Sequence, residues 1–182
     1  GMLEPLRRLE VRWQGKGEVF TLAQAEEMRR YPLQGAGLIR AIYANELLLR
    51  VLWQHQPQPE LFTRYQQLLQ HLLDVTNLLA LPLFELEVLA NAGYVLNLWH
   101  DDAAGDIIRS TQRYRFRPEH GLYPDGMDAK GVPISGKLLI ALREPFSLSH
   151  DLRLELRYTL DYLIQMLLNG RVLNARRLLT DV

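Results

Sequence analysis

The feature that most constrains the fold of this chain is a nearly apolar segment at residues 38–53. Its apolar side chains recur at helical spacing and cover much of the circumference: Leu38, Ile39, Ile42, Tyr43, Leu48, Leu49, Val51, Leu52 and Trp53. Such a helix must be covered by other helices, so the segment predicts a helix buried on most sides. Asn45 and Glu46 are polar residues within it, and buried polar groups need partners. We predict that both bridge neighbouring segments; a binding role is the alternative.

Length and charge limit the possible classes of protein. A chain of 182 residues is expected to form one domain, or one domain with a small appendage. Lys+Arg and Asp+Glu both number 21, so any contact with a polyanion must come from a local patch. Cysteine is absent, which excludes disulfides, thiolate zinc sites and cysteine nucleophiles. Without a signal peptide or a long apolar span, the expected location is the cytoplasm.

The first thirty residues predict a β-ribbon. Residues 6–13 and 18–22 read as two short strands, and the loop 14–17 between them carries Gly15 and Gly17 for positive backbone φ angles. Residues 23–30 predict a short helical turn that ends before Pro32. Such a ribbon is marginal by itself and must pack on another element.

The rest of the chain predicts helices around a β insertion. Helices are expected from Pro59 to about residue 72, over 78–92, from Ser135 to about residue 142, over 152–168 and over 173–179. Strands are expected at 113–117, 122–123 and 132–134. The predicted fold is mainly α, a helical bundle with an N-terminal β-hairpin and a small irregular β insertion. The predicted domains are a ribbon at 1–26 and a helical domain at 27–182, with the insertion at about 95–134.

No motif predicts catalysis. The most site-like cluster is His100, Asp101 and Asp102, but adjacent side chains point in different directions and no second His or Cys stands at ligand spacing. Glu85 and Glu87, two residues apart, belong on different helix faces. We therefore expect a solvated loop, no metal, no cofactor and no enzymatic activity. A hydrolase centred on His100 and Asp102 is a minor alternative.

Local basic clusters are more informative about function. They lie in the ribbon, in the strand 113–117 and near the C-terminus: Arg7, Arg8, Arg12 and Lys16; Arg113, Arg115 and Arg117; Arg171, Arg176 and Arg177. In the strand, alternate arginines should face solvent while Tyr114 and Phe116 face the core. Phosphate contact is the alternative interpretation of this strand.

The order of several short motifs resembles the bacterial RecO family of DNA repair proteins across nearly the whole chain. In the ribbon they are Leu3-Glu4-Pro5-Leu6 and the stretch from Val11 to Glu18. In the helices they are Tyr43, Asn45 and Glu46, the run Pro59 to Phe62, Phe84 with Glu85, Gly93 with Tyr94, and Gly170-Arg171 with Leu173 and Arg176. No single motif is specific, but their order is.

This resemblance implies a recombination mediator of the RecF pathway that works without enzymatic chemistry. Such proteins bind single- and double-stranded DNA, anneal strands, help to load the recombinase, and contact RecR and the C-terminal tail of single-stranded-DNA-binding protein. The ribbon then corresponds to the remnant of an OB-fold, and the protein is expected to associate with the nucleoid. Their local positive charge, together with this resemblance, makes Arg171, Arg176 and Arg177 the predicted nucleic-acid contacts, followed by Arg7, Arg8 and Lys16.

Two departures from the family bear on these expectations. Some members bind zinc through four cysteines in the mid-chain insertion, and residues 99–124 contain none. Pro82 and Leu83 stand where many members carry a basic pair suited to the acidic tail, which puts tail binding at that point in question. A protein-interaction module without direct DNA contact is the competing hypothesis.

Overall fold

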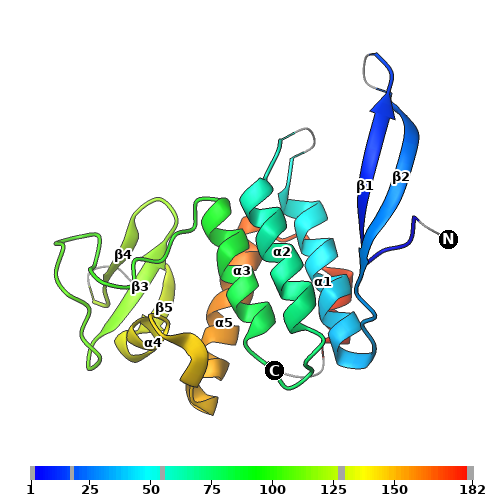
Figure 1. Ribbon diagram of the computed structural model, residues 1–182. Coiled ribbons are helices and arrows are strands. Elements are labelled where there is room, and N and C mark those ends of the chain that lie inside the picture. The colour runs from blue at the N-terminus through cyan, green and yellow to red at the C-terminus, as the bar shows by residue number, and fades with distance from the viewer. Residues whose placement is uncertain (1–2, 17–18, 54–55, 127–129, 180–182) are drawn as a thin grey trace.

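The computed structural model describes residues 3–16, 19–53, 56–126 and 130–179. A helical bundle lies at the centre, with a β-ribbon on one side and a small three-stranded sheet on the other (Figure 1). The bundle consists of α1 (Gly35–Val51), α2 (Pro59–His71), α3 (Ala80–Asn91) and α5 (His150–Leu167). This architecture confirms the predicted fold class. No described helix combines the length and apolar character needed to cross a membrane.

The central helix of the bundle is α3, which packs against α1, α2 and α5. Leu81, Phe84, Val88 and Leu89 are buried along it, and so is Glu85. Pro82 sits in the first turn, where a missing backbone N–H costs no helical hydrogen bond. Because neighbours cover α3 on several sides, its sequence has apolar residues around most of its circumference.

Helix α1 is buried or half-buried at most positions, as predicted, but part of its apolar surface stays open to solvent. Its buried residues include Ala41, Tyr43, Ala44 and Leu47, whereas Leu49 is 83% exposed. Ile42 within α1 is exposed as well, and so is Trp53, which lies just beyond the end of the helix. The sequence could not reveal this asymmetry, because apolar residues lie on both the covered and the open face.

The ribbon pairs β1 (Arg7–Gln14) with β2 (Thr21–Arg30) in antiparallel register. The helical turn expected over residues 23–30 was therefore wrong, because those residues belong to β2. Ala, Gln, Glu, Met and Arg in this stretch favour a helix, but pairing along the length of β1 overrides that local preference. The ribbon projects from the bundle beside α1 and joins it near Tyr31, whose N–H donates to the carbonyl of Leu6 at 3.1 Å.

The β insertion forms a sheet with the strand order β4 (Gly121–Pro124), β3 (Arg113–Arg117), β5 (Val132–Ser135). Tyr114 and Phe116 of β3 are buried, as predicted, and the alternate arginines lie on the opposite face. One of them, Arg115, pairs with Asp125 at 2.6 Å. Helix α4 (Gly136–Ala141) follows β5 directly, and both elements pack against α5.

Side-chain caps set where the later helices begin. Ser135 accepts a hydrogen bond from the N–H of Leu138 at the start of α4, and Ser149 accepts one from Leu152 at the start of α5. The short 3₁₀ helix η1 (Pro145–Ser147) lies between them. After α5, Asn169 and Gly170 adopt positive φ angles of 49° and 76° and end the helix. The predicted terminal helix is a 3₁₀ helix, η2 (Asn174–Leu178).

Candidate functional site

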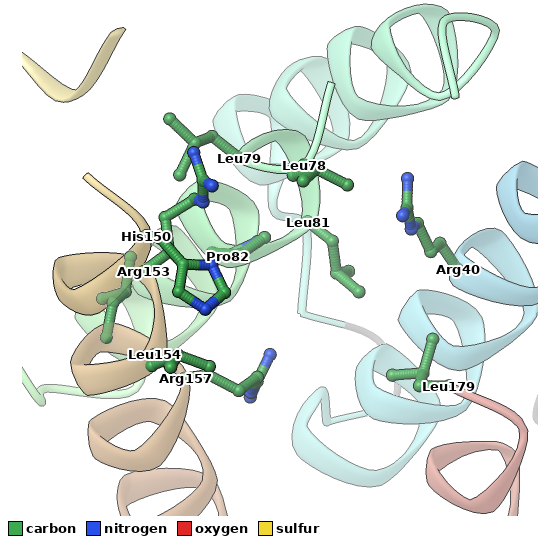
Figure 2. Close-up of a pocket in the computed structure, with 11 residues that line it drawn as sticks. Arg40, Leu78, Leu79, Leu81, Pro82, His150, Arg153, Leu154, Arg157 and Leu179 are labelled. Atoms are coloured by element: carbon green, nitrogen blue, oxygen red, sulfur yellow. The ribbon is translucent and has the colours of Figure 1, made fainter. Parts of the chain in front are cut away.

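A cavity of about 460 Å³ opens between α3, α5 and α1 (Figure 2). Most of its wall is apolar and comes from the start of α3, from α5 and from the C-terminal segment: Leu78, Leu79, Leu81, Pro82, Leu154, Leu156 and Leu179. Four basic side chains complete the lining: Arg40, His150, Arg153 and Arg157. Arg40 enters from α1 on one side, and His150 and Arg153 from α5 on the other. We call this cavity the basic pocket.

Two of these arginines lack an anionic partner in the described part of the chain. Arg40 is only 6% exposed, and its Nη1 donates to the carbonyl oxygen of Val75 at 3.3 Å. Arg153 donates to the carbonyl oxygen of Leu148 at 3.1 Å. No described carboxylate lies within ion-pair distance of either guanidinium. Because a buried charge is costly without a counter-charge, the basic pocket favours an anionic ligand.

Arg157 joins the basic pocket to a buried charge network. Its Nη1 and Nη2 donate to the Glu85 carboxylate at 2.6 and 3.1 Å, and Nη2 also donates to Asp161 at 2.8 Å. Arg176 of η2 donates to Asp161 at 2.6 and 3.1 Å. Burial lowers the pKa of Arg157, but the charge and hydrogen bonds of Glu85 together with the charge of Asp161 outweigh it, so the net shift is upward and the guanidinium stays charged. Its Nε is buried without a hydrogen-bond partner in the described residues.

Tyr43 extends this network to α1. Its hydroxyl donates to Glu85 at 2.6 Å, and burial, with the charge of Glu85, raises the pKa of the phenol well above its usual range. The network therefore crosses the bundle from α1 through α3 and α5 to η2. Its charged members are the two carboxylates Glu85 and Asp161 and the two guanidiniums Arg157 and Arg176, which balance.

Asn45 and Glu46 act as the predicted bridges. The Glu46 carboxylate accepts from the N–H groups of Asn174 and Ala175 at 2.9 and 2.8 Å, which ties η2 to α1. These two bonds, aided by Arg50, lower the pKa of Glu46. Asn45 accepts from the Tyr65 hydroxyl at 2.5 Å, and burial raises the pKa of Tyr65 to about 12.

The other signature residues also support the fold. Phe84 packs near the Tyr65 ring, with centroids 6.1 Å apart. Gly93 has a φ of 89°, and the N–H of Tyr94 donates to the Leu89 carbonyl at 2.8 Å as α3 ends. Glu85 is buried whereas half of the Glu87 side chain is exposed, so the two carboxylates face different environments, as predicted. These residues identify the sequence but line no common site.

The basic residues predicted to bind nucleic acid occupy two kinds of environment. Arg171, Arg177 and Lys16 are exposed, and none has an ion-pair partner among the described residues. Arg8 is a surface donor to Gln66 at 3.2 Å. By contrast, Arg7 pairs with Glu4 and Glu27, and Arg176 pairs with Asp161. Their positive charge is therefore partly offset within the chain.

The carboxylates beside His100 shape a loop. Asp101 accepts from the N–H groups of Ala103, Ala104 and Asp106, and Asp102 accepts from the N–H of Leu122 and the amide of Asn97. In the described ranges, no three His, Cys, Asp or Glu residues are placed to hold a metal ion. The two carboxylates thus hold the start of the β insertion in shape.

Sequence reasoning did not find the basic pocket, because it considered only the positions of Pro82 and Leu83. Pro82 lines the pocket, while the cations come from α1 and α5. The spacing of His150, Arg153 and Arg157 could have indicated a basic stripe along one helix face. Arg40 gave no such signal, since only the tertiary structure brings α1 to this cavity.

A family model and several known proteins that are similar to this chain all point to the same family. The family model described as "Recombination protein O C terminal" matches residues 34–176. DNA repair protein RecO of Nitrosospira multiformis is 34% identical over 100% of this chain and 76% of its own length. The RecO proteins of Halorhodospira halophila and Methylococcus capsulatus are 35% and 37% identical, over 98% and 97% of this chain and 77% and 73% of their own lengths. The chain belongs to the RecO family of DNA repair proteins.

Proposed function

We propose that this chain acts as a recombination mediator without enzymatic chemistry, and that the basic pocket receives the acidic C-terminal tail of single-stranded-DNA-binding protein. The observation that carries this proposal is the placement of Arg40 and Arg153 beside an apolar cavity with no described carboxylate paired to them. Pro82 and Leu83 carry no charge at the start of α3, so the positive charge for an acidic peptide would come from Arg40 of α1 and Arg153 of α5.

An acidic peptide matches both parts of this lining. Its carboxylates would pair with Arg40 and Arg153. An apolar side chain of the peptide would fill the space between the leucines, where burial of apolar surface stabilises binding. The pocket therefore combines charge recognition with an apolar anchor.

Peptide binding tests this part of the proposal. A fluorescent peptide with the tail sequence is titrated with the wild-type chain and with Arg153→Ala, which removes one pocket cation. We expect affinity to fall about tenfold, as for loss of one charged contact. Lys137→Ala, an exposed lysine on α4, is the matched control and should bind as the wild type does. Equal affinity of wild type and Arg153→Ala would remove the pocket from the proposal.

We propose that the exposed basic residues contact DNA, with Arg171 and Arg177 as the main contacts and Arg8 and Lys16 as further ones. Phosphate neutralisation releases counterions, so affinity should fall steeply with salt. Absence of binding to any oligonucleotide at low salt would overturn this assignment. So would unchanged affinity in the Arg171→Ala/Arg177→Ala variant, which leaves the Arg176–Asp161 pair in place. Contact with RecR, strand annealing, recombinase loading and association with the nucleoid belong to the same proposal.

A protein-interaction module without DNA contact is the second candidate. The zero net charge and the ion pairs that hold Arg7 and Arg176 favour it. Parallel titrations with RecR, the acidic-tail peptide and a DNA oligomer separate the two functions. Binding to the proteins alone would support the interaction module.

A further inference from the structure

The outer face of α5 carries two exposed aromatic rings. Tyr158 is 74% exposed and Tyr162 is 50% exposed. Four residues apart on one helix, they lie one turn from each other on the same side. Gln165, also exposed, continues this side of α5 by a further turn. Two neighbouring exposed rings on one side of a helix form a small apolar patch that is available to a ligand.

A second, smaller cavity of about 260 Å³ adjoins this stripe. Gln165 belongs to both, and Asp161, the residue before Tyr162, also lines the cavity. The remaining wall is mostly apolar, from the end of α5, the segment after it and α1: Tyr43, Ile164, Leu168, Gly170, Val172 and Leu173. An apolar space of this size with an amide and a carboxylate at its edge suits a small planar heterocycle.

Cations complete the surface. Arg171 and Arg176 line the small cavity, and Arg177 follows Arg176 in η2. Arg176 is held against Asp161, so it has a fixed position, whereas Arg171 and Arg177 are exposed without an ion-pair partner in the described residues. Aromatic faces beside unpaired cations are the combination that binds single-stranded nucleic acid, with bases on the rings and phosphates on the cations.

We propose that this surface binds single-stranded nucleic acid through its bases. Bases stack on Tyr158 and Tyr162, one unstacked base enters the small cavity beside Gln165, and Arg171 and Arg177 contact the phosphates. This inference rests on the proposed DNA binding and specifies its ligand: in a duplex the base faces are stacked inside and cannot reach the rings. A protein ligand would equally cover the tyrosines, but Arg171, which lines the cavity next to this stripe, and Arg177, which follows Arg176 in η2, match a polyanion.

The experiment separates the contribution of the bases to binding affinity from that of the sugar-phosphate backbone. Binding of an oligothymidine, of an abasic oligomer of the same length, and of a duplex is measured by fluorescence anisotropy at low salt. We expect the abasic oligomer to bind at least about tenfold more weakly than oligothymidine, since base stacking supplies part of the affinity. The Tyr158→Ala/Tyr162→Ala variant should lose about tenfold or more for oligothymidine and nothing for the abasic oligomer. Phe146→Ala, which removes an exposed ring elsewhere, is the control.

A photo-crosslinking measurement adds a readout that a merely structural role would not produce. An oligomer carrying 5-iodouracil is irradiated on the wild-type chain, and the linked residues are identified by mass spectrometry; we expect links at Tyr158 or Tyr162. Equal binding of the oligothymidine and the abasic oligomer would overturn the inference and leave DNA binding intact. Binding of neither would overturn the proposed function. Loss of RecR binding in the tyrosine variant, with DNA binding unchanged, would assign the surface to a protein.

Discussion

Arg157 of α5 and Glu85 of α3 form a two-point ion pair inside the bundle, with N–O distances of 2.6 and 3.1 Å. The Glu85 side chain is fully buried and that of Arg157 is 7% exposed. The two residues are 72 positions apart in sequence, so the pair fixes how α5 lies on α3. The same guanidinium also borders the basic pocket, and a structural pair therefore shapes the candidate site.

Removing one partner of this pair should be strongly destabilising. Glu85→Leu leaves Arg157 buried with only Asp161 as a counter-charge, and we expect a loss of about 3–5 kcal/mol in the free energy of unfolding. Replacing both residues, as Glu85→Leu/Arg157→Met, should recover most of that loss, because no unpaired charge stays buried. Urea denaturation of the three chains tests this. A single variant as stable as the wild type would show that the pair is not buried in solution.

Arg176 and Arg177 should differ in their effect on stability although they are neighbours. Arg176→Ala removes two hydrogen bonds to Asp161 and should cost about 1–2 kcal/mol. Arg177→Ala removes an exposed side chain with no ion pair in the described residues, and we expect a change within about 0.5 kcal/mol. Thermal unfolding of both variants measures the difference. Equal losses would contradict the placement of Arg176 in the network.

Glu46→Ala should cost stability before it affects binding. The substitution leaves the N–H groups of Asn174 and Ala175 without their acceptor, and we expect a loss of about 1–3 kcal/mol. Urea denaturation gives the free energy of unfolding, and DNA titration of the folded variant gives the affinity. An unchanged stability with lost DNA binding would instead make Glu46 part of the binding site.

The Glu46 contribution should also depend on pH. The folded chain lowers the pKa of Glu46 from its ordinary value of 4.5, so ionised Glu46 favours the folded state. Its stabilisation is complete above the unfolded pKa and is lost as the pH falls through the lower folded pKa. The difference in unfolding free energy between the wild type and Glu46→Ala should therefore shrink between neutral pH and about pH 3. A difference independent of pH would mean that the carboxylate charge plays no part.

Gly136 should tolerate no side chain. A Cβ at this position would lie 1.9 Å from the carbonyl oxygen of Arg109, a backbone atom that cannot move without shifting the β insertion. We expect Gly136→Ala to destabilise the fold by about 1–3 kcal/mol or more through overpacking. Lys137→Ala, at the next and exposed position, is the control and should unfold near the wild-type temperature. Similar melting temperatures for both variants would contradict this close approach.

The sequence by itself determined the local elements and the family. Ser135 marked a helix start, and alternation in β3 placed Tyr114 and Phe116 inside, because these signals act within a few residues. Motif order likewise led to the RecO family without any knowledge of contacts. The bridging role of Asn45 and Glu46 also followed from their polarity in an apolar helix.

Only the tertiary structure decided which face of each element is covered. Residues 23–30 became a strand because β1 lies beside them, and α1 kept an exposed apolar face because α3, not α1, occupies the centre of the bundle. The basic pocket joins Arg40 to Arg153 and Arg157, more than a hundred positions apart in sequence. Burial and charge pairing depend on neighbours distant in the chain, and local patterns carry little information about them.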